Sequence, residues 1–361
     1  MHQDRRLGAG RSETQGDRTV EAQMSEPKRG GTRMTPRLKR CIAAAALAAA
    51  PLTAPAETLS LATWGTSSHP QVKLFTQPFM ETVEKKTNGA IKFKYFPDDQ
   101  MVKQNFVPNA VPTGTVDIAL TTLDSWAGRI PDVSVTAMPF WPFSMEETRA
   151  QLVPGNPVFD WFDQAFQKNG AKILCIFDIG PGVVSTNFEL RLPENLKGKK
   201  IRATSKGQAE LLQSLGAAPV VLSVGEVYQA LQRGTVDGAI GGLQGMVGLK
   251  HYEVAKYLMA SNGVLGTYVH GYVMNLKRFN SLSKEQQQIV MAAATEARNA
   301  AQDFMIESYQ KFLGVAQEKG MKLFTLQKSS SEWEKWQAAL ASFNAEHKRS
   351  FSPELLKALG Q

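Results

Sequence analysis

Residues 196–238 constrain the fold of this chain most, because strand and helix patterns alternate there with a stop signal at each boundary. Gly216 follows a helix-like run, at the position where a left-handed residue commonly ends a helix. Ser223 with Glu226 three residues later has the pattern of a capping box, and Gly234 ends the helix that follows. The stretch therefore predicts a β-α-β-α-β unit of an open α/β sheet.

Arg202 lies where the first short strand of this unit meets a loop. That strand-end edge is where open α/β sheets bind ligands. A guanidinium group there offers a planar fork of donors suited to a carboxylate. The alternative interpretation is a surface arginine that pairs with a nearby acid and contributes little.

The string Gly-Thr-Val-Asp occurs twice, at 114–117 and at 234–237. Each copy follows a helix pattern and precedes a strand pattern, which indicates a duplicated half. We expect two related α/β lobes, each a mixed sheet flanked by helices, with ligand between them. Ser283, with Gln286 three residues later, starts a helix pattern that continues to Lys319, about 55 Å long and able to span both lobes.

The predicted lobes divide the chain at 180–182, where Gly-Pro-Gly breaks a buried strand over 171–177. We expect the first lobe to comprise residues 57–180 with a segment near 268–305. The second would comprise 181–267 with the C-terminal part of the long helix and 306–361.

Residues 1–56 are excluded from this division, because they contain a secretory signal peptide. A basic segment over 34–40 precedes an apolar run over 41–50 that is too short to span a membrane, and Ala-Pro-Ala ends at Ala56. We expect cleavage after Ala56, a periplasmic mature chain, and translation from Met34 rather than Met1.

The basic character of the chain belongs largely to this segment. Of 41 Lys and Arg and 33 Asp and Glu, ten basic and five acidic residues precede Glu57, leaving 31 against 28. A net charge of about +3 on the mature chain gives no nucleic-acid footprint. No run of 18 apolar residues follows Ala56, which predicts a soluble protein, and we expect a monomer.

Catalytic and metal-binding patterns are missing from the sequence. The mature histidines are scattered, and neither H-E-x-x-H nor G-x-S-x-G occurs. Cys175 is the one cysteine after Ala56, so no disulfide pair or thiolate metal site is expected. The sequence predicts no enzyme, no metal and no cofactor.

Several motifs resemble the solute-binding proteins of tripartite ATP-independent periplasmic (TRAP) transporters, of the C4-dicarboxylate-binding type. They include Leu-Lys-Gly-Lys-Lys-Ile-Arg at 196–202, Asn-Gly-Ala-Ile-Lys-Phe at 88–93 and Tyr-Glu-Val-Ala-Lys-Tyr at 252–257. The resemblance implies a two-lobed, type II-like periplasmic binding protein fold. It also implies a small and a large membrane permease subunit as partners, and that Arg202 holds the carboxylate of the bound acid.

Further ligand contacts follow from the resemblance and from positions at predicted strand ends. The aromatic side chains suit a cleft that covers an organic ligand, and the amide and hydroxyl groups suit its polar atoms. Besides Arg202, the expected ligand-binding residues are Trp64, Gln100, Thr122, Trp126, Phe140, Gly182, Gly241, Gly242 and Gln244.

Two departures from the family pattern bear on the ligand. Where relatives carry an amide-bearing stretch, this chain has Gly241 and Gly242, whose backbone N–H groups could hold an anion or form a flexible loop. Where relatives often carry a polar residue, it has Gly182 and Val183. We therefore favour a keto or hydroxy monocarboxylate with an apolar or aromatic end over a C4-dicarboxylate. A periplasmic ligand sensor and a two-lobed enzyme are the alternative functions.

Overall fold

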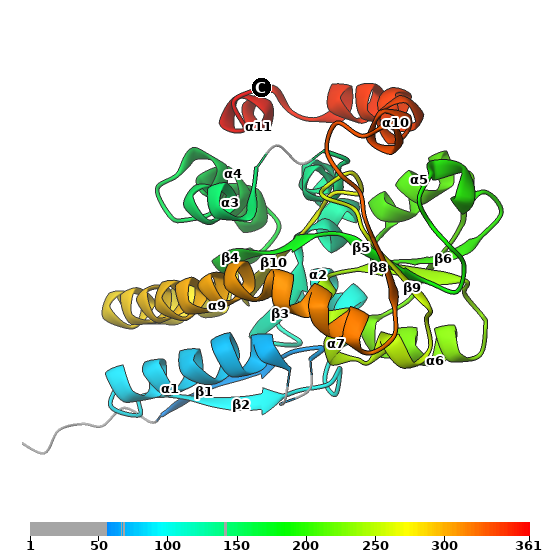
Figure 1. Cartoon of the computed structure of the whole chain (residues 1–361). Helices are drawn as coiled ribbons and strands as arrows, with labels where there is room; N and C mark the ends of the chain where they lie inside the picture. The colour runs from blue at the N-terminus through cyan, green and yellow to red at the C-terminus, as the bar shows by residue number, and fades with distance from the viewer. Residues whose placement is uncertain (1–55, 66, 68, 141–142) are drawn as a thin grey trace, which may run out of the picture. The chain divides into compact units, whose positions relative to one another are not determined.

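The computed structural model describes residues 56–65, 67, 69–140 and 143–361 (Figure 1). The predicted signal sequence, including Met34 and the apolar run, lies outside the described residues. Among those described, no helix is both long and apolar enough to cross a membrane.

The first of two mixed sheets has five strands in the order β2-β1-β3-β10-β4. β1 pairs in parallel with β2 and β3, whereas β10 runs antiparallel to β3 and β4. The strands are β1 (Glu57–Ala62), β2 (Ile91–Phe96), β3 (Ile118–Thr122), β4 (Ala171–Pro181) and β10 (Thr267–Asn275).

The second sheet has six strands in the order β11-β9-β5-β8-β6-β7. β6 pairs in parallel with β7 and β8, and β5 lies antiparallel between β8 and β9. The strands are β5 (Val183–Thr186), β6 (Lys200–Ala203), β7 (Ala218–Val221), β8 (Gly238–Gly241), β9 (Tyr257–Ala260) and β11 (Lys322–Thr325). Two mixed sheets confirm the predicted α/β class.

Two adjacent connections join the sheets. Gly182 separates β4 from β5, and its N–H donates to the carbonyl of Gly266 just before β10, at 3.1 Å. β4 extends to Pro181, so the break expected from Gly180 onward falls at Gly182 alone. The predicted residue ranges of the two lobes stay a prediction.

The helices flank both sheets. They are α1 (Gln77–Lys86), α2 (Val107–Thr113), α3 (Met145–Gln151), α4 (Pro157–Lys168), α5 (Lys206–Ser214), α6 (Val227–Gln232), α7 (Leu243–Gly248), α8 (Leu276–Ser281), α9 (Lys284–Glu318), α10 (Ser331–Ser350) and α11 (Pro353–Ala358). The strands and helices expected over 196–238 are all present as β6, α5, β7, α6 and β8, which confirms the predicted β-α-β-α-β unit.

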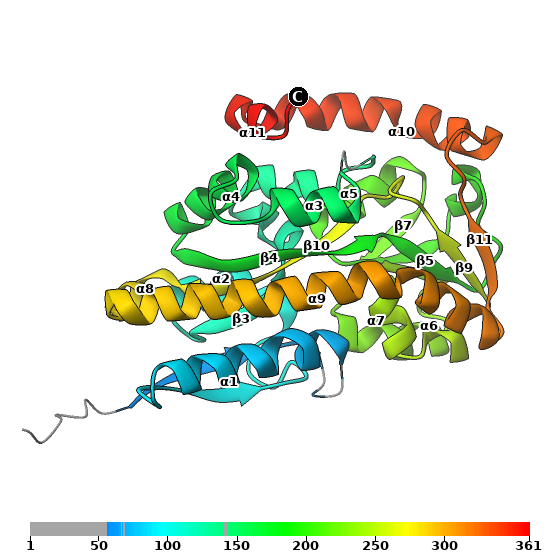
Figure 2. The ribbon, with the colours of Figure 1, turned by 60° about the vertical axis from the view of Figure 1, so that its left-hand side comes forward.

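Helix α9 confirms the predicted spanning helix, with 35 residues and the expected capping box at Ser283 and Gln286. It packs against α1 and β4 at the first sheet and against α7 and β11 at the second (Figure 2). The buried Gln302 fixes this packing, because its amide exchanges two 2.8 Å hydrogen bonds with the backbone of Asp178 in β4.

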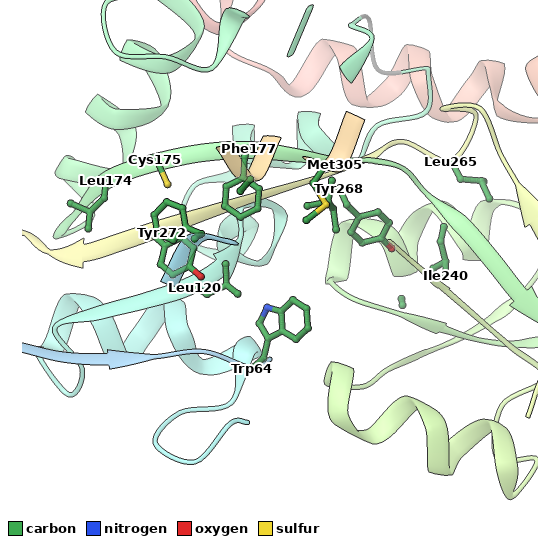
Figure 3. Packing of buried hydrophobic residues seen from close by; sticks show 14 of the residues in the cluster. Trp64, Leu120, Leu174, Cys175, Phe177, Ile240, Leu265, Tyr268, Tyr272 and Met305 are labelled. Atoms are coloured by element: carbon green, nitrogen blue, oxygen red, sulfur yellow. The ribbon is translucent and has the colours of Figure 1, made fainter. Parts of the chain in front are cut away.

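Apolar side chains fill the space between the sheets and α9 in one continuous cluster. Figure 3 shows Phe177 and Tyr272 from the first sheet and Met305 from α9 in this cluster, with Ile240 of the second sheet at its other end. The shared core connects both sheets to the spanning helix.

The duplicated Gly-Thr-Val-Asp string adopts the same arrangement in both sheets. Gly114 and Gly234 both take positive φ angles, 77° and 66°, directly after a helix. Asp117 Oδ2 accepts hydrogen bonds from the N–H and hydroxyl of Ser60, both at 2.7 Å. Asp237 Oδ2 accepts from the N–H of Lys200 at 2.8 Å. Each aspartate thus joins the start of a strand to the neighbouring parallel strand.

Replacing these aspartates tests the duplication. We expect Asp117→Ala to lower the free energy of unfolding by about 1.5–3 kcal/mol, because it removes hydrogen bonds to a charged acceptor. Asp237→Ala should lower it by less, because that carboxylate serves one backbone N–H in place of two donors. Urea unfolding measures both. Equal losses, or none for Asp117→Ala, would contradict the arrangement, and Glu81→Ala at an exposed position of α1 serves as the control.

Candidate functional site

A cavity lies between the two sheets and is lined by residues of both. The space between protein atoms there is about 520 Å³, part of it continuous with solvent, and about 40 Å³ of it can hold the centre of a water molecule. Its polar and aromatic lining comprises Trp64, His69, Gln71, Gln104, Thr122, Arg202, Thr204, Gln244, His251, Tyr268 and His270.

Arg202 lies at the carboxyl end of β6 and is only 3% exposed. Its Nε donates to the carbonyl of Leu222 at 3.0 Å, and its Nη1 donates to the carbonyl of Ile240 at 3.1 Å. These two bonds fix the plane of the guanidinium group. Its Nη2 is buried without a hydrogen-bond partner among the described residues. The arginine therefore has one donor arm held free toward the cavity region.

Unpaired buried polar atoms gather at this cavity. Most buried polar groups of a folded protein have hydrogen-bond partners. Among the described residues, seven side-chain atoms of the lining have none: Trp64 Nε1, His69 Nε2, Gln71 Oε1, Arg202 Nη2, Gln244 Nε2, Gln244 Oε1 and His251 Nε2. Such a concentration indicates a site that a polar ligand completes.

The three histidines of the lining are neutral at pH 7. Burial lowers the pKa of His69 to about 4. Burial, with the charge of Arg202 as the second cause, lowers the pKa of His251 to about 3. Burial and the neighbouring His69 lower the pKa of His270 to about 3. The cavity thus holds imidazole rings that add hydrogen-bonding groups without adding charge.

A π-helical turn over Val72–Thr76 follows two of these polar residues. The N–H of Val72 donates to the carbonyl of His69 at 3.0 Å, which ties the histidine to the start of the turn. The Nε2 of Gln71 lies 3.0 Å from Nδ1 of His270 in β10. π-helical turns are rare and often occur at functional sites. Here the turn places His69 and Gln71 at the cavity.

Six of the predicted ligand-binding residues lie together in the lining. They are Trp64, Thr122, Arg202, Gly241, Gly242 and Gln244. A Cβ on Gly242 would collide with the side chain of Ile179, and one on Gly241 would lie 3.9 Å from Nη1 of Arg202. A Cβ on Gly241 would also lie 3.2 Å from Cε of Met246, so glycine at these two positions allows Ile179 and Met246 to pack closely against the backbone.

Trp126 and Gln100 lie outside the lining. Trp126 is fully buried, because its ring packs against Phe166 at 4.6 Å between centroids and its Nε1 donates to Thr121 Oγ1 at 3.1 Å. Gln100 is exposed in the turn after β2. The first is turned into the core of the lobe and the second toward solvent.

Phe140 and Gly182 also lie outside the lining. Phe140 packs edge-on against Trp333 of α10, with 5.4 Å between ring centroids. Gly182 is enclosed where the chain crosses between sheets, and a Cβ there would lie 3.3 Å from the carbonyl oxygen of Leu265. Phe140 therefore packs away from the cavity, whereas Gly182 packs beside Tyr268, a lining residue whose Cε2 would lie 3.4 Å from a Cβ at position 182.

Seven polar lining residues were not singled out by the sequence analysis: His69, Gln71, Gln104, Thr204, His251, Tyr268 and His270. His69 and Gln71 lie shortly after the carboxyl end of β1, the same signal that marked Trp64. His270 lies within a fully buried strand, and only the pairing of β10 beside β3 brings it to the site. In the described residues, no group of His, Cys, Asp and Glu could hold a metal ion.

Comparisons with known proteins agree with this architecture. Residues 61–350 match the model of the bacterial extracellular solute-binding protein family 7. The chain is 27% identical over 284 residues to the C4-dicarboxylate-binding periplasmic protein DctP of Rhodobacter capsulatus, covering 78% of this chain and 84% of that protein. It is 26% identical over 262 residues to the 2,3-diketo-L-gulonate-binding periplasmic protein YiaO of Escherichia coli, covering 72% and 79%.

Solved structures show the same fold. The Bordetella pertussis extracytoplasmic solute receptor DctP7, which binds pyroglutamic acid, has a TM-score of 0.76 at 18% identity and covers 85% of this chain and 100% of that chain. A TRAP periplasmic solute-binding protein of Sulfurospirillum deleyianum with bound succinate has a TM-score of 0.76 at 24% identity, covering 85% and 99%. The chain therefore belongs to the bacterial extracellular solute-binding protein family 7, the solute-binding proteins of TRAP transporters.

Proposed function

We propose that this protein binds one carboxylate of a small organic acid at Arg202 and delivers the acid to a membrane permease of two subunits, one small and one large. The observation that carries the proposal is the buried Nη2 of Arg202, which has no partner among the described residues while Nε and Nη1 are fixed by backbone carbonyls. No carboxylate of the described residues accepts from Nη2, although Asp124 and Glu226 lie close enough to raise the pKa of Arg202. A buried donor without an acceptor is unfavourable. A carboxylate at Nη2 would satisfy both the donor and the charge.

The charge of the lining favours a monocarboxylate. Arg202 is the one charged side chain among the lining residues, because the three histidines are neutral. A second carboxylate would be buried in the cavity without a cation to pair with it, and a buried unpaired charge is costly. Asp124, buried in the turn after β3, lies close enough to influence the pKa of Arg202 and would repel a further anion.

The named relatives and neighbours bind organic acids of different kinds, among them a C4-dicarboxylate, 2,3-diketo-L-gulonate and pyroglutamic acid. A keto or hydroxy monocarboxylate fits the single cation better than a C4-dicarboxylate does. The family supports a periplasmic transport role and membrane permease partners.

Substitution of Arg202 tests the proposal. We expect Arg202→Ala to weaken binding of a monocarboxylate by about 2–5 kcal/mol, roughly 30- to several-thousand-fold in Kd. Arg202→Lys should recover only part of the affinity, because a point charge cannot reproduce the planar fork. Titration calorimetry on acids found by thermal-shift screening measures both.

The matched control is Arg129→Ala, which removes an exposed arginine bonded to Asn109 and should leave binding unchanged. Wild-type affinity in Arg202→Ala would make that arginine purely structural. Strongest stabilisation by succinate or malonate would contradict a monocarboxylate ligand.

The neutral histidines give a pH dependence with a defined sign. The pKa of His251 is about 3 in the folded chain against 6.5 ordinarily, so at pH 5 only the unfolded chain takes up this proton. Stability is therefore lost as the pH falls below 6.5. We expect His251→Asn to reduce the loss in unfolding free energy between pH 7.5 and pH 5 by roughly 2 kcal/mol.

Urea unfolding at the two pH values measures this difference. Burial also raises the pKa values of Asp99 and Asp178 to about 6, so these carboxyl groups stabilise the folded chain as the pH falls. Wild type and variant both contain them, so their contributions cancel in the comparison. An equal pH dependence in wild type and variant would show that His251 is not held neutral.

A further inference from the structure

The unpaired atoms around the cavity include acceptors as well as donors, and a carboxylate can satisfy only the donors. This difference carries information on the rest of the ligand, beyond the group that Arg202 binds. The relevant side chains are Gln71 and Gln244, supported by the neutral His69.

Gln71 presents an acceptor. Burial keeps the His270 ring neutral by lowering its pKa, and in the tautomer whose Nδ1 carries no proton, Nε2 of Gln71 donates to this Nδ1, 3.0 Å away. The Oε1 of Gln71 is buried and has no partner in the part of the chain that the structure describes. With Gln71 itself only 1% exposed, water has little access to this oxygen. A donor from the ligand is needed to pair it.

Gln244 presents both a donor and an acceptor. It lies in α7 beside Gly242, is 1% exposed, and neither atom of its amide group has a partner among the described residues. If the oxygen and nitrogen of the amide exchange places, one donor and one acceptor still lack partners. A group that both donates and accepts, such as a hydroxyl, can pair with both.

His69 adds a donor. The backbone N–H of Gln71 donates to Nδ1 of His69 at 3.3 Å, so the proton of the neutral ring is on Nε2. That Nε2 is also buried without a partner among the described residues. The ligand therefore needs acceptors as well as donors outside its carboxylate.

An apolar ligand end would leave these groups unpaired. Each buried polar group left without a partner costs about 1–3 kcal/mol, and the penalty falls on every ligand that lacks the matching group. A second carboxylate would supply acceptors only and would bring uncompensated charge. The sequence-based expectation of an apolar or aromatic end therefore does not fit Gln71 and Gln244.

We propose that Gln71 and Gln244 are specificity-determining residues that select monocarboxylates carrying hydroxyl or N–H groups and reject their deoxy counterparts. This inference rests on the proposed binding of the carboxylate by Arg202. It adds a requirement for hydrogen-bond donors on the ligand, which the arginine alone does not impose.

Matched pairs of acids test the requirement. The probes are gluconate against hexanoate, quinate against cyclohexanecarboxylate, and pyroglutamate against cyclopentanecarboxylate, each measured by titration calorimetry at pH 7.5. The first member of each pair carries hydroxyl or N–H groups on a similar carbon skeleton. For at least one pair we expect the first member to bind more than tenfold more tightly to the wild type.

Gln71→Leu and Gln244→Leu keep the approximate size of the side chain and remove the amide. Each should weaken the first member of that pair by about 5- to 150-fold and leave the deoxy acid as tight or tighter, so the ratio collapses. Gln213→Leu is the matched control, because it makes the same change at an exposed position of α5 outside the cavity lining. This control should keep a ratio near that of the wild type, and thermal melts verify that all variants fold.

Three outcomes overturn the inference: equal affinity for both members of every pair, a wild-type ratio in both leucine variants, or no binding by any pair. Failure of the proposed function looks different. In that case Arg202→Ala retains the affinity of the wild type, or succinate and malonate bind more tightly than every monocarboxylate. If Arg202→Ala loses all binding while the wild type binds both members of each pair equally, the proposed function is upheld. The role of Gln71 and Gln244 is then rejected.

Discussion

The guanidinium group of Arg202, held in place by two backbone carbonyls, is the interaction on which the site depends. The carbonyls belong to Leu222, just after β7, and to Ile240 in β8, so the strands on both sides of β6 orient the arginine. Burial lowers the pKa of Arg202, which shows that the charged form is disfavoured where it stands. Under the proposed function, the carboxylate of the ligand would offset this penalty.

At the cavity, segments that follow strands of the first sheet contact segments that follow strands of the second. Thr204, after β6, has its hydroxyl 3.4 Å from Oδ2 of Asp124, which follows β3. Lys103 and Glu226 form an ion pair at 3.4 Å between the segments after β2 and β7. Exposed ion pairs of this kind contribute little. The ion pair therefore adds little to the contact between these two segments.

The position of Arg202 was predictable because its signals are local: a short strand, a capping serine and glycines that end helices within 43 residues. The duplicated aspartates were predictable for the same reason. Trp126 was not, because a 3-10 turn after β3 directs its ring to Phe166 instead of the cavity. His270 carried no local signal, since its place at the site comes from the pairing of β10 with β3, a contact across more than 140 residues.

Neutral histidines are consistent with the proposed preference for a single negative charge in a cavity with so many donors. A protonated imidazole beside Arg202 would add a second cation and so stabilise a dicarboxylate, the class bound by some named relatives. Burial prevents this by holding the pKa of His251 at about 3, and the positive charge of Arg202 lowers the pKa further in the same direction. Arg202, the proposed carboxylate-binding residue, thus also disfavours protonation of His251. What the imidazoles and amides retain is hydrogen bonding, which distinguishes ligands by their hydroxyl and N–H groups and not by charge.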